Sequence, residues 1–89
     1  MNSSQPEQIK SAAILYKGKI YTGKRHPAIG HHMIQNKICP RPFPGGDAQG
    51  FVTMSGKFVG REEAGRIALA AGQITKLKWP PDLYSEDIL

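Results

Sequence analysis

The chain has 89 residues and a formal net charge of +5, and this length fits one domain and no more. Its single cysteine excludes a disulfide framework, and no apolar run approaches the roughly 20 residues that a membrane span needs. A lone thiol fits a reducing compartment, so we expect a cytoplasmic protein that has no membrane partner. Because a domain this small has a marginal core, we also expect self-association.

The first predicted element is a β-hairpin. A polar head, residues 1–8, is expected to be disordered and to precede one domain over residues 9–89. Residues 9–16 end in good strand formers, residues 17–18 form a two-residue turn, and residues 19–22 return as a second strand.

A helix is predicted next. Gly23 breaks the strand, and Pro27 suits the first turn of a helix that we expect to run to about Lys37. Residues 40–46 contain three prolines and two glycines, which predicts a loop.

The second half repeats this layout. Residues 50–54 and 57–59 read as strands joined by a turn at residues 55–56. A helix follows, with acids in its first turn and Gly72 placed to end it. Its apolar positions are Ala64, Ile67, Ala68, Ala71 and Ile74. Residues 79–89 read as a loop with a short strand or docked extension. The order ββα–ββα predicts an α+β fold, in which two hairpins form a small antiparallel sheet and two helices pack on it.

Positive charge is concentrated in the first half. Residues 8–46 contain no acid, whereas from Asp47 onward six acids face five bases. One-sided charge of this kind indicates an anionic partner, the alternative being a solvated face that only aids solubility. The bases of the first half are Lys10, Lys17, Lys19, Lys24, Arg25, Lys37 and Arg41, and all three histidines accompany them.

The turn from Gly23 to Pro27 is the first candidate site. Gly23 lets the backbone approach a ligand, and Lys24, Arg25 and His26 precede a helix start whose free N–H groups attract phosphate. An arginine fork can hold two phosphate oxygens. The pattern favours a phosphate-bearing ligand, although an ordinary solvated turn would have the same residues.

A second candidate is the segment Gln49-Gly50-Phe51 at the start of a strand. An aromatic ring after a flexible loop can stack on a nucleobase, as in sequence-tolerant nucleotide binders. A phenylalanine at such a position is more often part of the core, so the sequence leaves both roles open.

Metal binding and catalysis have little support. The three histidines and Cys39 lack the spacing of a zinc site, and Cys39 has no evident base partner. Glu62 and Glu63 are consecutive and diverge on a helix, as helix-dipole partners do. We therefore expect no metal, no cofactor and no enzymatic activity.

Short motifs over nearly the whole chain after residue 8 form a distinctive combination. They lie at residues 11–14, 18–26, 49–53, 56–64, 71–74 and 83–87. Together they resemble a family of small bacteriophage proteins that includes the first-described class of Thoeris anti-defence sponges. The chain departs from that pattern at Lys24, Pro27 and Gly60, and in its proline-rich loop, residues 39–46.

The resemblance implies a non-enzymatic sponge for a cyclic ADP-ribose isomer made by bacterial TIR-domain enzymes. It implies dimers, with hexamers in some members, ligand pockets at the dimer interface, and separate sites for cyclic oligonucleotides in some members. The basic triplet would contact phosphate, the aromatic residue would stack on the base, and the turn after the second hairpin would lie beside the pocket. The implied ligand-binding residues are Lys24, Arg25, His26, Gln49, Phe51, Gly60 and Arg61.

The main alternative is a small phage accessory protein that binds nucleic acid, because a basic half suits a phosphate backbone. The aromatic residues are few and are not interleaved with the cations, which argues against it. A third interpretation is an accessory protein that binds and blocks a host protein, and no residue of the sequence excludes it.

Overall fold

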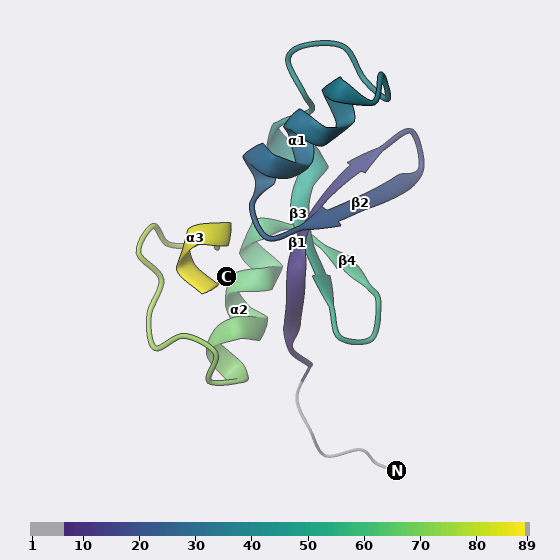
Figure 1. The fold of residues 1–89 in the computed structure, drawn as a ribbon. Coiled ribbons are helices and arrows are strands. Elements are labelled where there is room, and N and C mark those ends of the chain that lie inside the picture. Colours follow the sequence, from purple (N-terminus) through teal and green to yellow (C-terminus); the bar gives the residue numbers. More distant parts are fainter. Residues whose placement is uncertain (1–6, 89) are drawn as a thin grey trace.

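The structure is a computed structural model that describes residues 7–88, so most of the predicted disordered head lies outside the described residues. Its elements are β1 (Ile9–Tyr16), β2 (Lys19–Gly23), α1 (His26–Gln35), the 3-10 turn η1 (Gly46–Ala48), β3 (Gln49–Thr53), β4 (Phe58–Val59), α2 (Arg61–Ala70) and α3 (Ser85–Ile88) (Figure 1). The α+β class and the ββα–ββα order are confirmed. The short helix α3 is an addition within the segment predicted as a loop.

The two predicted hairpins join into one antiparallel sheet with the strand order β2-β1-β3-β4. The long strand β1 lies inside the sheet, where Ala12 pairs with Gly23 of β2 and with Phe51 of β3. Phe51 in turn pairs with Val59 of β4. None of the helices described is long and apolar enough to cross a membrane.

The β1–β2 turn follows from its two residues. Lys17 and Gly18 have φ angles of 49° and 79°, the left-handed values that a two-residue hairpin turn requires. Glycine adopts such values without strain. The predicted turn is confirmed, and it fixes the register in which Tyr16 pairs with Lys19.

Both long helices pack on one face of the sheet. Their buried side chains join those of the strands in a single core cluster, to which the tail adds Leu83. The members of the cluster are Ile9, Ala12, Ile14, Ile29, Met33, Cys39, Phe51, Val59, Ala64, Ala68 and Leu83. The fold therefore has two layers.

The second face of the sheet follows from strand alternation and register. Its residues are Ser11, Ala13, Leu15, Ile20, Thr22, Gly50, Val52 and Phe58. None of the eight is charged. Leu15 and Ile20 are 38% and 42% exposed, and no described helix packs on this face. We call it the open face.

The helix ends differ slightly from those predicted. Helix α1 ends at Gln35, because Lys37 takes a left-handed φ of 58°. After α2, Gly72 has a φ of 74°, and the N–H of Gln73 donates to the carbonyl of Ala68 at 2.9 Å. This is the predicted glycine stop, although Ile74, expected on the helix, lies beyond it.

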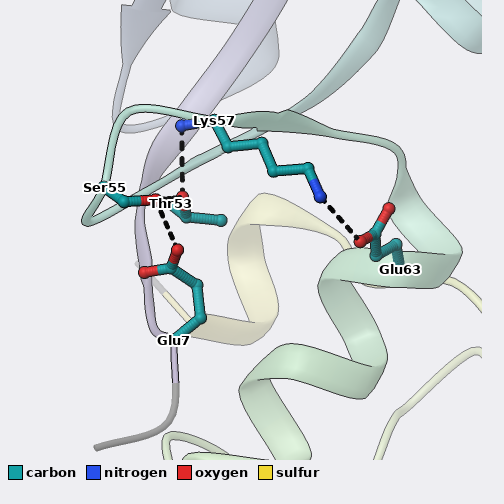
Figure 2. Close-up of polar contacts among 5 residues, drawn as sticks. All are labelled: Glu7, Thr53, Ser55, Lys57 and Glu63. Carbon is teal, nitrogen blue, oxygen red and sulfur yellow. Dashed lines mark hydrogen bonds and ion pairs between the residues drawn. The ribbon is translucent and has the colours of Figure 1, made fainter. Parts of the chain in front are cut away.

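A polar network ties the start of β1 to the β3–β4 turn and to α2 (Figure 2). The Ser55 hydroxyl donates to the Glu7 carboxylate and lies 3.0 Å from Thr53 Oγ1, which accepts from the Lys57 N–H at 3.2 Å. The Lys57 ammonium lies 3.6 Å from the Glu63 carboxylate. The hydrogen bond from Ser55 lowers the pKa of the Glu7 carboxyl.

Candidate functional site

Lys24 and Arg25 lie where the sequence places them, exposed in the turn before α1. Arg25 is the N-cap residue, with extended backbone and no side-chain cap for the first-turn N–H groups. Its guanidinium donates long hydrogen bonds to the carbonyls of Lys24 at 3.3 Å and Ser85 at 3.4 Å. The turn thus combines two solvent-facing cations with a helix start that carries no side-chain cap.

His26 has a different role from the predicted phosphate contact. Its side chain is buried, and Nε2 lies 2.7 Å from the Gly50 carbonyl, to which it donates. Its ring meets the Phe51 ring edge-on, with centroids 5.2 Å apart. Burial lowers the pKa of His26, so the ring is neutral at pH 7. His26 joins the start of α1 to β3 and offers no positive charge to a phosphate.

The buried imidazole predicts acid-sensitive stability. An unfolded His26 takes up a proton near its ordinary pKa of 6.5, whereas in the folded chain protonation needs a lower pH. The stabilisation is complete above pH 6.5 and declines as the pH falls below it. Urea unfolding should give a lower midpoint at pH 5.5 than at pH 7.5. The Glu7 carboxyl changes the stability only in more acidic solution, below its ordinary pKa of 4.5.

His26→Gln is the matched variant, because its amide can donate to the Gly50 carbonyl without titrating. We expect the urea midpoint of this variant to vary much less between pH 7.5 and 5.5. An equal pH dependence in the two proteins would contradict the assignment to His26.

Phe51 is also placed differently from the prediction. Its side chain is 0% exposed and packs in the core between the sheet and the helices. A base cannot reach its ring, so the predicted stacking role is wrong in this structure. The core role that the sequence left open is the observed one.

Arg61 is the centre of the region that joins the sheet to the tail. Its guanidinium donates to Gln49 Oε1 at 2.6 Å and to the Leu83 carbonyl at 3.0 Å. It also lies over the Tyr84 ring, 4.4 Å from the centroid. Burial lowers the pKa of Arg61 and the Tyr84 and Asp82 side chains oppose this, so the group stays charged at neutral pH.

Two hollows meet at this arginine, and both are lined by Gln49, Arg61 and Tyr84. The larger measures about 860 Å³ and extends past Gly60 along the start of α2. The charged residues on its walls are Asp47, Arg61, Glu62, Glu63, Arg66 and Asp82. The smaller measures about 210 Å³ and lies between the start of α1 and Ser85.

Gln49, Gly60 and Arg61 therefore share the larger hollow, as expected of residues around one pocket. Lys24 and Arg25 line neither hollow, but Arg25 contacts the backbone of Ser85 at the edge of the smaller one. Tyr84 was missed. Its position under Arg61 depends on the tail folding back over β3 and α2, and its only sequence signal is its place within residues 83–87.

In the part of the chain that the structure describes, the cations of the first half have no acidic partners. All seven are exposed, and none forms an ion pair within residues 7–88. Both ion pairs of the described residues, Lys57–Glu63 and Arg66–Glu62, belong to the second half. Within the same residues, no three histidine, cysteine or acidic side chains gather as a metal site requires.

Comparison with known proteins identifies the family. A family model described as phage T4 y16D protein matches residues 8–89, nearly the whole chain. The chain belongs to the phage T4 y16D protein family. No curated protein and no solved structure matches it. The predicted bacteriophage origin is confirmed for this y16D-family protein, whereas the link to Thoeris anti-defence stays a prediction.

Proposed function

We propose that this y16D-family protein is a non-enzymatic sponge that binds a cyclic nucleotide signal and so blocks bacterial anti-phage signalling. A cyclic ADP-ribose isomer is the first candidate ligand, and cyclic oligonucleotides are the second. The observation that carries the proposal is the position of Arg25. It is exposed, has no acidic partner within residues 7–88, and contacts the edge of a hollow that contains Arg61 stacked on Tyr84.

The chemistry of this region suits a nucleotide. Lys24, Arg25 and the uncapped N–H groups of α1 supply donors and positive charge for phosphate. The larger hollow of about 860 Å³, which meets the smaller one at Arg61, has the size of a small-molecule site. Its carboxylates, such as Asp47 and Asp82, can accept hydrogen bonds from sugar hydroxyls and base amino groups.

Binding without turnover is part of the proposal. His26, which lines the smaller hollow, is committed to the Gly50 carbonyl, and Cys39 is buried away from solvent. Arg61 is held by two hydrogen bonds and cannot accept a proton. His26, Cys39 and Arg61 are therefore suited to positioning a ligand and not to proton transfer or nucleophilic attack, and we assign the carboxylates of the larger hollow to hydrogen bonds with the ligand.

A thermal-shift panel of cyclic ADP-ribose isomers and cyclic di- and trinucleotides tests the proposal. A binder of the native state raises the unfolding midpoint in proportion to its affinity and concentration. We expect a rise for one ligand class. Lys24→Ala/Arg25→Ala should weaken binding about tenfold or more, because charge-assisted hydrogen bonds contribute roughly 1.5–3 kcal/mol each.

The matched control is Lys10→Ala/Lys19→Ala, which removes two exposed lysines from the same half of the chain. It should bind like the wild type. An equal loss in both double variants would reduce the effect to net charge, and no midpoint shift with any ligand would contradict the proposal.

We also propose that the protein self-associates through the open face of the sheet. This face is uncharged, so two copies that each carry a charge of +5 can meet here without opposing like charges. An antiparallel sheet that faces water usually alternates apolar and polar residues, whereas here Leu15, Ile20 and Phe58 lie on the outer side. Stacked sheets approach to about 10 Å and bury such side chains.

Sedimentation velocity over a range of concentrations tests the assembly. The wild type should show a reversible dimer, and Ile20→Lys should shift it to monomer by placing a charge on the open face. Leu69→Lys is the control, because Leu69 is similarly exposed (39%) but lies on α2. A monomeric wild type, or equal behaviour of the two variants, would exclude this interface.

A further inference from the structure

The loop between α2 and α3 presents the single tryptophan of the chain to solvent. Trp79 is 60% exposed, although a tryptophan side chain normally buries about 150–250 Å² of surface in a folded protein. It lines neither of the hollows around Arg61. The proposed cyclic nucleotide site therefore does not account for its exposure.

The backbone beneath this ring is fixed. Trp79 and Asp82 form an antiparallel bridge, in which the Asp82 N–H donates to the Trp79 carbonyl at 3.0 Å. Pro80 and Pro81, whose rings restrict φ, occupy the turn between them. The next residue, Leu83, donates its N–H to the Arg61 carbonyl at 3.0 Å. A ring on such a turn loses little conformational entropy when it binds.

Two lysines that shortly precede Trp79 in the chain have no ion-pair partner among the described residues. From Asp47 onward, Lys57 and Arg66 are in ion pairs and Arg61 is bonded to Gln49 and Leu83. Lys76 and Lys78, both exposed, form no ion pair within residues 7–88.

The same two lysines line a hollow of about 630 Å³ that has Ile74 and Leu77 in its wall. Asp87 also lines it, but its Oδ2 accepts the Tyr84 N–H at 2.9 Å. Asp82, across the bridge from Trp79, lines the hollow around Arg61 instead. Residues 76–79 therefore combine an exposed indole with two ammonium groups that no carboxylate of residues 7–88 pairs with.

We infer that Trp79, Lys76 and Lys78 form a second binding surface, whose ligand is single-stranded nucleic acid. A base stacks on the indole, and the two ammonium groups pair with neighbouring phosphates, which is how sequence-tolerant binders hold single strands. An acidic peptide is less suited. A protein contact of this kind centres on a contiguous apolar patch, whereas the other exposed large apolar side chains lie on the open face, in the β3–β4 turn and on α2.

The tryptophan itself is the probe, because it is the only one in the chain. Titration with a thymidine oligonucleotide of about 15 residues should quench its fluorescence to saturation, at a length that covers the known site sizes of such binders. Binding should weaken log-linearly with salt, as phosphate contacts require. Double-stranded DNA of the same length should quench much less, since its bases are already stacked.

Anisotropy of a labelled oligonucleotide reports the variants. Trp79→Ala should weaken binding roughly 5- to 150-fold, the range for loss of one stacked base, and Trp79→Phe should restore part of it. Lys76→Ala/Lys78→Ala should lower the slope of log K against log salt by about 1.4, or roughly 0.7 for each phosphate contact. Circular dichroism should show that all three variants fold, because the three side chains are exposed.

The variants distinguish a failure of this inference from a failure of the proposed sponge function. Trp79→Ala should leave the thermal shift with cyclic nucleotides unchanged, and Lys24→Ala/Arg25→Ala should leave the quenching of Trp79 unchanged. The inference is overturned if the oligonucleotide does not quench Trp79, or if Trp79→Ala binds it like the wild type. It is also overturned if an acidic peptide, such as polyglutamate, produces the response and the oligonucleotide does not.

Discussion

Phe51→Ala is expected to destabilise the protein by about 3–5 kcal/mol, the usual cost of removing a fully buried aromatic side chain. The ring is 0% exposed, belongs to the core cluster and supports the His26 ring at 5.2 Å. Because the free energy of unfolding of a domain is only roughly 5–15 kcal/mol, such a loss removes a large part of it. Urea unfolding followed by circular dichroism should show a much lower midpoint for the variant than for the wild type.

Phe43→Ala is the control for this change. Phe43 is half-buried and packs over Gly30, outside the cluster of fully buried residues, so its loss should cost clearly less. If Phe51→Ala kept the stability of the wild type and lost only nucleotide binding, the ring would be a stacking residue after all.

Gly50→Ala is the second large effect. A β-carbon at this position would lie 2.2 Å from the Val59 carbonyl oxygen and 2.8 Å from the Phe58 ring. The backbone oxygen belongs to the β3–β4 pairing and cannot move without breaking it. We expect a destabilisation of about 3 kcal/mol or more, at the upper end of overpacking effects.

Gly45→Ala gives the comparison for this position, because the nearest atom to its β-carbon would be 3.9 Å away and its φ of −121° suits any residue. The free energy of unfolding of this variant should lie within about 0.5 kcal/mol of the wild-type value, as is usual for surface substitutions. Equal stabilities of the two glycine variants would mean that β4 is not held against β3 as described.

Local signals in the sequence predicted most of the fold. The turn at Lys17 and Gly18, the glycine stop at Gly72 and the strand formers of residues 9–16 each act over a few residues, and each has the expected outcome. How the two hairpins pair through β1 and β3 depends on contacts between residues about 40 positions apart, such as Ala12 with Phe51. Helix α3 is four residues long and needs the core contact of Leu83 beside it.

The candidate site was predicted only in part, because it too depends on contacts between residues far apart in the sequence. The family resemblance added Gly60 and Arg61, which share a hollow with Gln49, whereas sequence pattern identified Gln49 itself and the exposed cations before α1. It could not separate the neighbours Arg25 and His26, of which one faces solvent and the other is buried against Gly50. Only the position of β3 beneath the start of α1 decides that difference. Tyr84 likewise gains its role from a tail that folds back onto Arg61.

The most direct test of the central claim follows the ligand itself. The protein is incubated with a cyclic ADP-ribose isomer that raises its unfolding midpoint, freed of unbound ligand, and heated, and the released material is identified by chromatography and mass spectrometry. A sponge predicts that the ligand is depleted from solution in proportion to the protein and returns intact, with the same yield after minutes or hours. Recovery of a converted or degraded ligand, in an amount that grows with time, would contradict the sponge and indicate an enzyme.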